Sequence, residues 1–414
     1  RYIRYRMKKK IIVFGTGESA KKLLKAIKYK NAKIIAFADN NYNKHGKIFE
    51  NKMIINPRQI SEMRFDYIII SNIKYEKITR QLVENGIDDK KIFSYFNEKL
   101  IDNRDYKKIV DRCIVIRDIY DYKMLQMTIK INNMPYEIGG EAIRNNIVVK
   151  NIEQTMKCLL TTNVSISRFG DGEMKLIAGK DIGFQKYSAS LARRLQEVLV
   201  SCDMQNHIVG ILNVYGDLSM YTDEIQAYFR QYLFEYNREF QFSVMNKQKV
   251  YYDAFITRPY ISYKNREHTK TIFDQFKSLW DKKKILIVEG DRTRLGIGND
   301  LFKNAEEIKR IICPNENAYE KYDQIIEKIR LHCDKRLVLL ALGPAATILA
   351  YDLAKSDIRA LDIGHIDLEY EWYLMGAEEK VVVKNKYTNE VFGGNAKSLV
   401  TDKEYEQQII DIVK

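Results

Sequence analysis

Two carboxylates separated by one residue follow a short apolar run and suggest metal chemistry. Asp171 and Glu173 close the stretch SISRFGDGE, after a predicted strand over 164–167. In an extended loop this spacing turns both side chains to one side, where their oxygens suit Mg²⁺ or Mn²⁺, cations that also bridge a diphosphate. Arg168 and Gly170 could bind a phosphate in the same loop. The alternative is a helix cap, with Asp171 capping and Glu173 favouring the helix dipole.

Three more predicted strands end in polar loops: VEGDRTRLGIGND (288–300), ALGPAAT (341–347) and DIGHIDLEYEW (362–372). In open parallel α/β sheets ligands bind beyond the carboxyl ends of the strands, so these loops are expected to converge with the first. Convergence of four such loops is harder to explain by capping alone. The candidate donor-binding residues outside the first loop are Arg258, Arg292, Arg294, Asn299, Asp300 and Gly343.

The last of these loops holds the candidates for a catalytic base. His365 is the one histidine in a motif loop, and near neutral pH it could accept a proton or contact a sugar. A structural histidine at a helix start is the competing interpretation. Asp362, Asp367 and Glu371 are alternative bases, and the last two, at i and i+4, would share one helix face.

The elements that must position these loops alternate between strand and helix. In the first hundred residues, short apolar runs predict strands at 11–14, 33–38, 67–70 and 91–93. From residue 151, strands are predicted at 164–167, 208–212, 285–288, 308–312, 337–342 and 360–363, separated by helical patterns. The expectation is an α/β protein with two Rossmann-like parallel-sheet domains. The predicted divisions are 1–103, a helical spacer and connector over 104–150, and a catalytic domain over 151–414.

The first predicted domain carries a glycine loop of its own. Gly15, Gly17 and Ala20 lie between a strand and a helix, and Asp39 ends the next strand. That context predicts a nucleotide or nucleotide-sugar loop, with phosphate at the helix start and ribose on the acid. A structural or docking role is the alternative. A rival function for the whole chain follows from this loop, an NAD-dependent nucleotide-sugar oxidoreductase or epimerase.

Several motifs together resemble one known family. SISRFGDGE, YYDAFITRPY, VEGDRTRLGIGNDLF, RIICPNENAYEKYDQI, LALGPAATILAYDLA and DIGHIDLEYEW, from about Asn151 to Asn395, look like the GT-D-fold glycosyltransferases of bacterial adhesin and surface-glycan glycosylation. The resemblance implies a Rossmann-like catalytic domain that uses a nucleoside-diphosphate sugar, expected to be a UDP-sugar, and a divalent metal. The family's D-x-E element falls on Asp171 and Glu173. The implied acceptor is a glycan or glycoprotein, with a lipid-linked one left open. The first domain resembles small Rossmann-like domains fused to enzymes of surface-polysaccharide assembly.

Composition limits the remaining classes of function. The 414 residues carry a net charge of +14, but the basic residues are dispersed among acids, which argues against nucleic acid as a partner. Five scattered cysteines form no CxxC pair, so a reduced, cytosolic protein is expected. No apolar run reaches the ~18 residues of a membrane span. The basic N-terminus leads straight into a predicted strand, so no signal peptide is expected there. Peripheral association with the inner face of a membrane and a homo-oligomer are left open.

Overall fold

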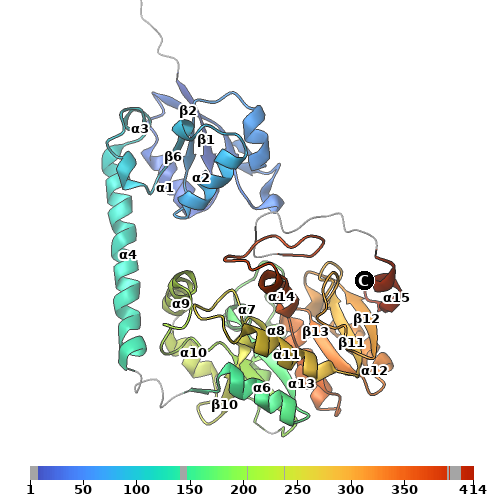
Figure 1. Ribbon diagram of the computed structural model, residues 1–414. Coiled ribbons are helices and arrows are strands. Elements are labelled where there is room, and N and C mark those ends of the chain that lie inside the picture. The colour runs from blue at the N-terminus through green and yellow to red at the C-terminus, as the bar shows by residue number, and fades with distance from the viewer. Residues whose placement is uncertain (1–7, 140–146, 203, 237, 389–390, 392–401) are drawn as a thin grey trace, which may run out of the picture. The chain divides into compact units, whose positions relative to one another are not determined.

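The computed structural model describes residues 8–139, 147–202, 204–236, 238–388, 391 and 402–414 (Figure 1). The chain forms two compact units, Arg1–Thr128 and Ile129–Lys414. The boundary falls within one long helix, α4 (Arg112–Gly139). Within the 104–150 predicted as a helical spacer and connector, this helix extends as far as residue 139, and residues 140–146 lie outside the described residues.

The end of α4, from residue 129 on, belongs to the second unit and is held by contacts within that unit. Glu137 forms an ion pair with Arg230 at 2.7 Å, and Asn133 donates to the Arg230 carbonyl at 3.1 Å. The guanidinium of Arg238 donates to the Asn133 side chain at 2.8 Å and stacks on the ring of Tyr136. These partners are about a hundred residues away along the chain, so no local pattern reveals them.

The first unit contains a six-stranded sheet in the order β3-β4-β2-β1-β5-β6, parallel except for the β3–β4 hairpin. In its central strand β1, residues 11–14 are buried, as this continuous apolar run predicts for a parallel sheet. The hairpin was not predicted; its turn residues Glu50 and Asn51 both have positive φ, which suits a two-residue turn. The elements are β1 (Lys9–Phe14), α1 (Glu18–Ala26), β2 (Ala32–Ala38), β3 (Ile48–Phe49), β4 (Lys52–Ile55), β5 (Tyr67–Ile70), α2 (Tyr75–Glu84), β6 (Ile92–Ser94) and α3 (Arg104–Ile109).

The second unit contains a nine-stranded sheet in the order β15-β12-β11-β13-β14-β8-β9-β10-β7, with every neighbouring pair parallel. All six strands predicted from residue 151 onward are present. The short strands β7, β10 and β15 were not predicted, because two to four residues carry too little pattern. The strands are β7 (Val148–Val149), β8 (Ser165–Phe169), β9 (His207–Ile211), β10 (Val250–Asp253), β11 (Lys284–Gly290), β12 (Glu307–Cys313), β13 (Leu337–Ala341), β14 (Ala360–Asp362) and β15 (Ile409–Ile412).

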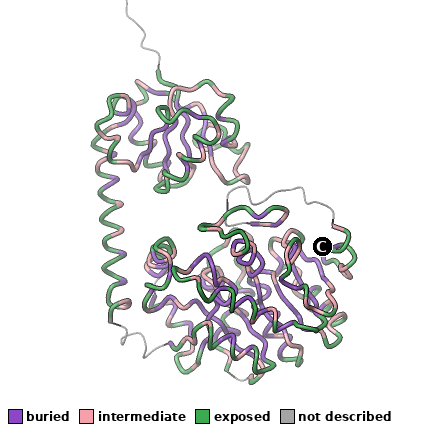
Figure 2. Tube along the Cα trace, in the orientation of Figure 1, coloured by how far each residue is buried: buried purple, intermediate pink, exposed green. Residues whose placement is uncertain are grey.

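Helices cover both faces of this sheet, since alternate residues of one strand enter different cores. In β11, Ile285 and Ile287 pack with α6, α11 and α14, whereas Leu286 and Val288 pack with α12 and α13. Figure 2 shows the buried strands between more exposed helices. The helices are α6 (Ile152–Thr161), α7 (Asp171–Ile177), α8 (Ala189–Val200), α9 (Asp223–Glu235), α10 (Arg238–Val244), α11 (Thr269–Trp280), α12 (Tyr322–His332), α13 (Pro344–Ala354), α14 (Ile366–Leu374) and α15 (Lys403–Gln408).

Strand order places the site. β8 lies between β14 and β9. The strands β9 and β10, which follow β8 in the chain, lie on one side of it, and the later strands β11 to β14 lie on its other side. Such a switch point leaves a crevice beyond the carboxyl ends of the strands.

The α/β prediction with two parallel-dominated sheets is confirmed. Within the described ranges, no helix has both the length and the apolar character to cross a membrane.

Candidate functional site

Arg168 joins the ends of three strands. Its Nε donates to the Asp362 carbonyl at 2.7 Å, and Nη2 donates to the Asp362 carboxylate at 2.9 Å and to the Gly364 carbonyl at 3.0 Å. Nη1 donates to the Thr257 hydroxyl at 2.6 Å and to the Ala254 carbonyl at 3.2 Å. A guanidinium has five N–H groups, and these contacts use all five. Since a phosphate would have to displace one of them, the structure gives Arg168 a positioning role in place of the predicted phosphate contact.

Asp171 begins α7 directly beyond β8, in a helix rather than in the extended loop that the sequence analysis assumed. Its Oδ2 accepts from Lys175 Nζ and from the Tyr228 hydroxyl, both at 2.5 Å. Burial alone would raise the pKa of Asp171, but Lys175, Tyr228 and the charge of Arg258 outweigh it and leave this pKa lowered. Asp171 is therefore a carboxylate at neutral pH. Lys175 was missed by the sequence analysis, although its i, i+4 spacing from Asp171 could have identified it.

Glu173 faces the protein interior, away from Asp171. Its Oε2 accepts from the Gly170 N–H at 2.7 Å, which is the glutamate half of a capping box, since Gly170 at the N-cap has no side chain to complete it. Residues two apart on a helix do not face each other, so the helix separates the two carboxylates. Burial, assisted by the nearby charges of Asp362 and Asp171, raises the pKa of Glu173 to about 7. The capping alternative holds for Glu173.

The fit of a divalent metal differs between these two carboxylates. Among the described residues, no group of three or more His, Cys, Asp or Glu side chains is arranged to hold a metal ion. A hard cation bound with substrate phosphates needs only one or two carboxylates, since water and phosphate oxygens complete its shell. Asp171 fits that requirement, because its side chain is 34% exposed and its contacts with Lys175 and Tyr228 both go to one oxygen, Oδ2. Glu173, buried and engaged with Gly170, does not fit as it is oriented here.

The other arginines predicted to bind phosphate occupy three different environments in the structure. Arg258 is near enough to Asp171 for its charge to lower the carboxyl pKa. Arg292 is partly exposed and lies 3.8 Å from the Asp291 carboxylate. Arg294 is buried, with a positive φ and its guanidinium 5.1 Å from the centre of the Tyr405 ring. Arg258 is therefore the arginine that the structure associates with Asp171.

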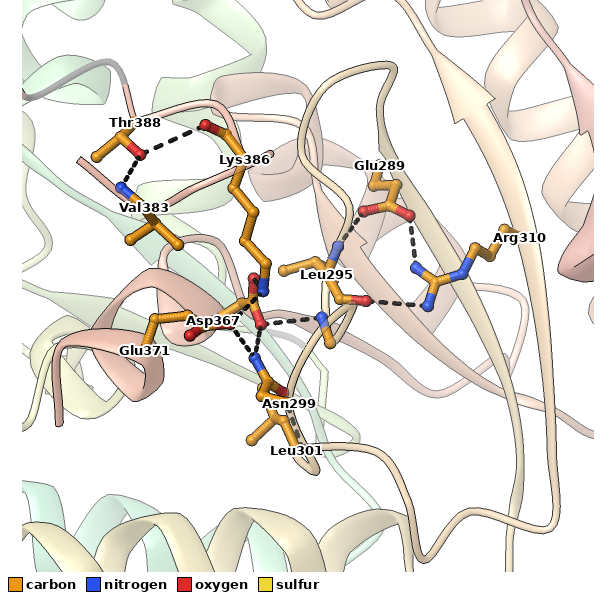
Figure 3. Close-up of polar contacts among 11 residues, drawn as sticks. Glu289, Leu295, Asn299, Leu301, Arg310, Asp367, Glu371, Val383, Lys386 and Thr388 are labelled. Carbon is orange, nitrogen blue, oxygen red and sulfur yellow. Dashed lines mark hydrogen bonds and ion pairs between the residues drawn. The ribbon is translucent and has the colours of Figure 1, made fainter. Parts of the chain in front are cut away.

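A buried ionic cluster lies beside α14 (Figure 3). Lys386 Nζ contacts the carboxylates of Asp367 at 2.6 Å and Glu371 at 2.8 Å. The Asn299 amide donates to the same two carboxylates, each at 2.8 Å, and the Gly296 N–H donates to Asp367 at 2.9 Å. The two acids predicted as alternative bases thus neutralise a lysine, and Asn299 uses both amide hydrogens to hold its own loop. Lys386 was not singled out from the sequence, because nothing local to it indicates burial.

The loop after β11 is also fixed from its other side. Glu289 and Arg310, both fully buried, form an ion pair at 2.6 Å; Glu289 accepts from the Leu295 N–H and Arg310 donates to the Leu295 carbonyl (Figure 3). Burial raises the pKa of Glu289 although Arg310 opposes the shift. Asp300 accepts from Lys277 at 2.8 Å and from Tyr370 at 2.5 Å, at the protein surface. These contacts fix the loop after β11 in place, so the structure indicates a structural role for its polar side chains.

His365 and Gly343 occupy helix starts with unusual backbone. His365 precedes α14 with a φ of 69°, directly after the Gly364 whose carbonyl accepts from Arg168. Gly343 precedes α13 with a φ of 53°, and a Cβ there would lie 2.6 Å from the Phe184 ring. A side chain at 343 is therefore excluded on two grounds. His365 is adjacent to the Arg168–Asp362 junction, and its role as base stays a prediction.

Asp253, at the end of β10, gives a pH-dependent expectation for stability. It is 2% exposed, accepts from the Phe255 N–H at 2.8 Å, and burial raises its pKa to about 7 from 3.8. Since the unfolded chain releases this proton first, the free energy of unfolding falls as pH rises from about 4 to about 7.

Asp253→Asn removes that loss, so the variant is expected to gain about 2–4 kcal/mol relative to wild type between about pH 5 and about pH 8. Thermal unfolding of both proteins across this range measures the difference, and any constant effect of the substitution cancels. A difference in melting temperature that does not change with pH would contradict the raised pKa.

The glycine loop of the first unit has a packing explanation. Gly15 has a φ of +105°, and a Cβ there would lie 2.6 Å from the Ser71 hydroxyl. Asp39 is engaged by its own neighbourhood: it accepts from Thr16, from Lys44 at 3.0 Å and from the Asn41 N–H at 2.9 Å. Gly17 is the N-cap of α1, and Ala20 is buried in its first turn. A ribose on Asp39 would have to displace these contacts, so nucleotide binding here stays a prediction.

Comparisons with known proteins agree with this architecture. Residues 166–391 match the family model described as glycosyltransferase GT-D fold, and residues 7–93 match a model described as C2185-like, N-terminal. A glycosyltransferase of known structure from Streptococcus sanguinis, titled as DUF1792, is 39% identical with a TM-score of 0.62, covering 65% of this chain and all of that one. A second structure, titled as a distinct glycosyltransferase fold, is 36% identical with the same TM-score over 65% of this chain and 97% of its own.

Two curated relatives come from streptococci. A probable glycosyl transferase Gly of Streptococcus gordonii is 39% identical over 66% of this chain, and the glycosyltransferase GlyD of Streptococcus pneumoniae is 34% identical over 64%. The matched regions are 39% and 32% of the lengths of these relatives. The resemblance drawn from the motifs is confirmed, and the chain belongs to the family of glycosyltransferases with the GT-D fold.

Proposed function

We propose that the chain transfers a sugar from a nucleoside-diphosphate sugar, a UDP-sugar in our expectation, to a glycan or glycoprotein acceptor, with a bound Mn²⁺ or Mg²⁺. The observation that carries the proposal is the ionised Asp171 at the end of β8, beside Lys175 and Arg258. A carboxylate flanked by two cations suits a metal–diphosphate group, because it binds the cation while its neighbours offset the phosphate charge.

Sugar transfer from such a donor builds negative charge on the departing diphosphate. The chain's own groups to offset it are Lys175, on the exposed side of α7, and Arg258. Asp171 would hold the metal, which when bound supplies further positive charge to the diphosphate. Lys175 lies within 6 Å of the ring centres of Tyr228, Tyr232 and Tyr236, and this aromatic surface favours a cation at that position.

His365 is our candidate for the base that takes the acceptor's proton. The other three candidates already have charge partners: Asp362 contacts Arg168 at 2.9 Å, while Asp367 and Glu371 contact Lys386. A carboxylate paired with a cation is a weaker base than a free one. His365 follows Gly364, which is fixed to Arg168, so its backbone is held close to the end of β8.

A thermal-shift screen with and without Mn²⁺ tests the donor class. Ligands that bind only the folded state stabilise it, by about 2.7 kcal/mol at a concentration a hundred times Kd. UDP and one UDP-sugar are expected to raise the melting temperature in the presence of Mn²⁺, with a smaller shift in chelator. NAD is the control, because a shift with NAD and none with any nucleoside diphosphate would favour the oxidoreductase alternative.

A further inference from the structure

Helix α4 carries two separate apolar stripes. One is buried against the protein and includes Val115, Ile119 and Ile129. The other, here called the outer stripe, is exposed. Its six side chains range from 45% exposed at Met134 to 78% at Ile138. The members of the outer stripe are Tyr120, Met124, Met127, Ile131, Met134 and Ile138. Much of α4 is coloured as exposed in Figure 2.

The spacing of the outer stripe is that of a coiled coil. Its members follow one another at intervals of four, three, four, three and four residues, an average close to the 3.5 of a heptad seam. Successive residues of a helix are ~100° apart, so this stripe lies on a different face from the buried one. One buried face is enough to attach a helix to its own protein. A second, regular seam of six large apolar residues is the pattern of a helix that pairs with another helix.

We propose that the occupant of the outer stripe is the same stripe of a second copy of the chain, in antiparallel orientation. The register that aligns all six residues places Tyr120 opposite Ile138 of the second copy, Met124 opposite Met134, and Met127 opposite Ile131. Each layer then contains one residue from each of the two alternating heptad positions. The stripe is complementary to itself, so a homodimer with twofold symmetry closes without further contacts.

Flanking charges favour the antiparallel arrangement. Lys123, which pairs with Glu98 of its own chain, comes beside Glu137 of the second copy, which pairs with Arg230 of its own chain; the two opposite charges meet twice and add to these existing ion pairs. In a parallel pair Lys123 would face Thr128, and Lys130 would face Pro135, so neither lysine would gain an acid. Lys130 meets its own counterpart across the twofold axis, a repulsion that long exposed side chains reduce by turning to solvent.

The area is sufficient for a specific contact. Six large side chains about half exposed, taken from two copies, remove on the order of 1,000 Å² from water, near the lower limit for specific interfaces. A contiguous apolar seam of this size is uncommon on a monomer. Methionines adapt to the irregular gaps between paired helices, and Ile131 and Ile138 supply the stiffer side chains.

Sedimentation of the intact chain over a wide concentration range tests the proposal. Wild type is expected to be a dimer, and Ile131→Glu to weaken it at least about a hundredfold, since two unpaired carboxylates enter the seam. Leu125→Glu is the matched control: Leu125 is an exposed apolar residue of the same helix, 45% exposed and off the stripe, and its variant is expected to stay dimeric. A monomeric wild type, or equal weakening by both variants, would overturn the proposal.

Disulfide trapping tests the orientation. In a background with the exposed Cys113 and Cys202 changed to serine, Met124→Cys copies mixed with Met134→Cys copies are expected to cross-link on oxidation. Cross-linking of Met124→Cys with itself would overturn the antiparallel arrangement. Flotation with phosphatidylglycerol vesicles tests the alternative that the outer stripe binds a membrane surface. A monomeric wild type that binds vesicles and loses binding on Ile131→Glu would overturn the dimer in favour of a membrane surface.

Discussion

Asp171→Asn is expected to lower sugar-donor turnover at least ~100-fold while leaving the fold intact. The substitution keeps the size of the side chain and removes the negative charge that the proposal assigns to the metal. Lys175 and Tyr228, which now share that charge at 2.5 Å, would be left without a carboxylate. Turnover of the donor under saturating Mn²⁺, with the melting temperature measured in parallel, checks both parts of the expectation.

Glu173→Gln is the contrast for this prediction. Its amide oxygen can still accept from the Gly170 N–H, so this bond and the start of α7 are retained. We expect less than about a tenfold loss of turnover, because the glutamate faces inward and acts through the backbone. Equal, large losses in both variants would restore the D-x-E pair as joint metal ligands and contradict the separate roles assigned here.

Lys386→Met is expected to destabilise the second unit by about 3–5 kcal/mol, because two buried carboxylates lose their counter-charge. Lys386 is 4% exposed, and its ammonium lies within 3 Å of Asp367 and Glu371. Methionine preserves most of the side-chain volume, so the formation of a cavity contributes little to the loss of stability. In thermal unfolding this corresponds to a decrease on the order of 10 °C for a unit of this size.

The control for Lys386→Met lies two residues away. Lys384 is exposed in the same segment, and Lys384→Met is expected to change the melting temperature by less than about 2 °C. Combining Lys386→Met with Asp367→Asn and Glu371→Gln should recover part of the lost stability, because the unpaired charges disappear with their partner. A Lys386→Met protein as stable as wild type would show that the cluster is not buried as described.

Local sequence pattern was sufficient for the longer strands and for the loops at their ends. Parallel strands are buried on both faces, so runs such as 285–288 and 337–341 are apolar throughout; the first of these ends at polar residues, which must lie at the sheet edge. The convergence of β8 and β14 followed from this rule and is present as the Arg168–Asp362 contact. The short strands β7 and β10 were missed because pairing partners, and not their own residues, make them strands.

The roles of individual side chains required the structure. Arg168 could be predicted at a strand end, but the five acceptors that occupy it come from residues 86 to 196 positions away. Asp367 and Glu371 were placed on one helix face, as found, yet their counter-ion comes from a segment with no motif. For Glu173, the sequence allowed both a metal ligand and a cap, and only the hydrogen bond to Gly170 separates them.

Release of UDP from UDP-sugars by the intact protein can be measured in Mn²⁺ and in chelator, with wild type and Asp171→Asn side by side. We expect release that requires both the metal and the Asp171 carboxylate, with an equal amount of sugar transferred when an acceptor is present. Release that continues unchanged in chelator, or in Asp171→Asn, would contradict the assignment of donor chemistry to the end of β8.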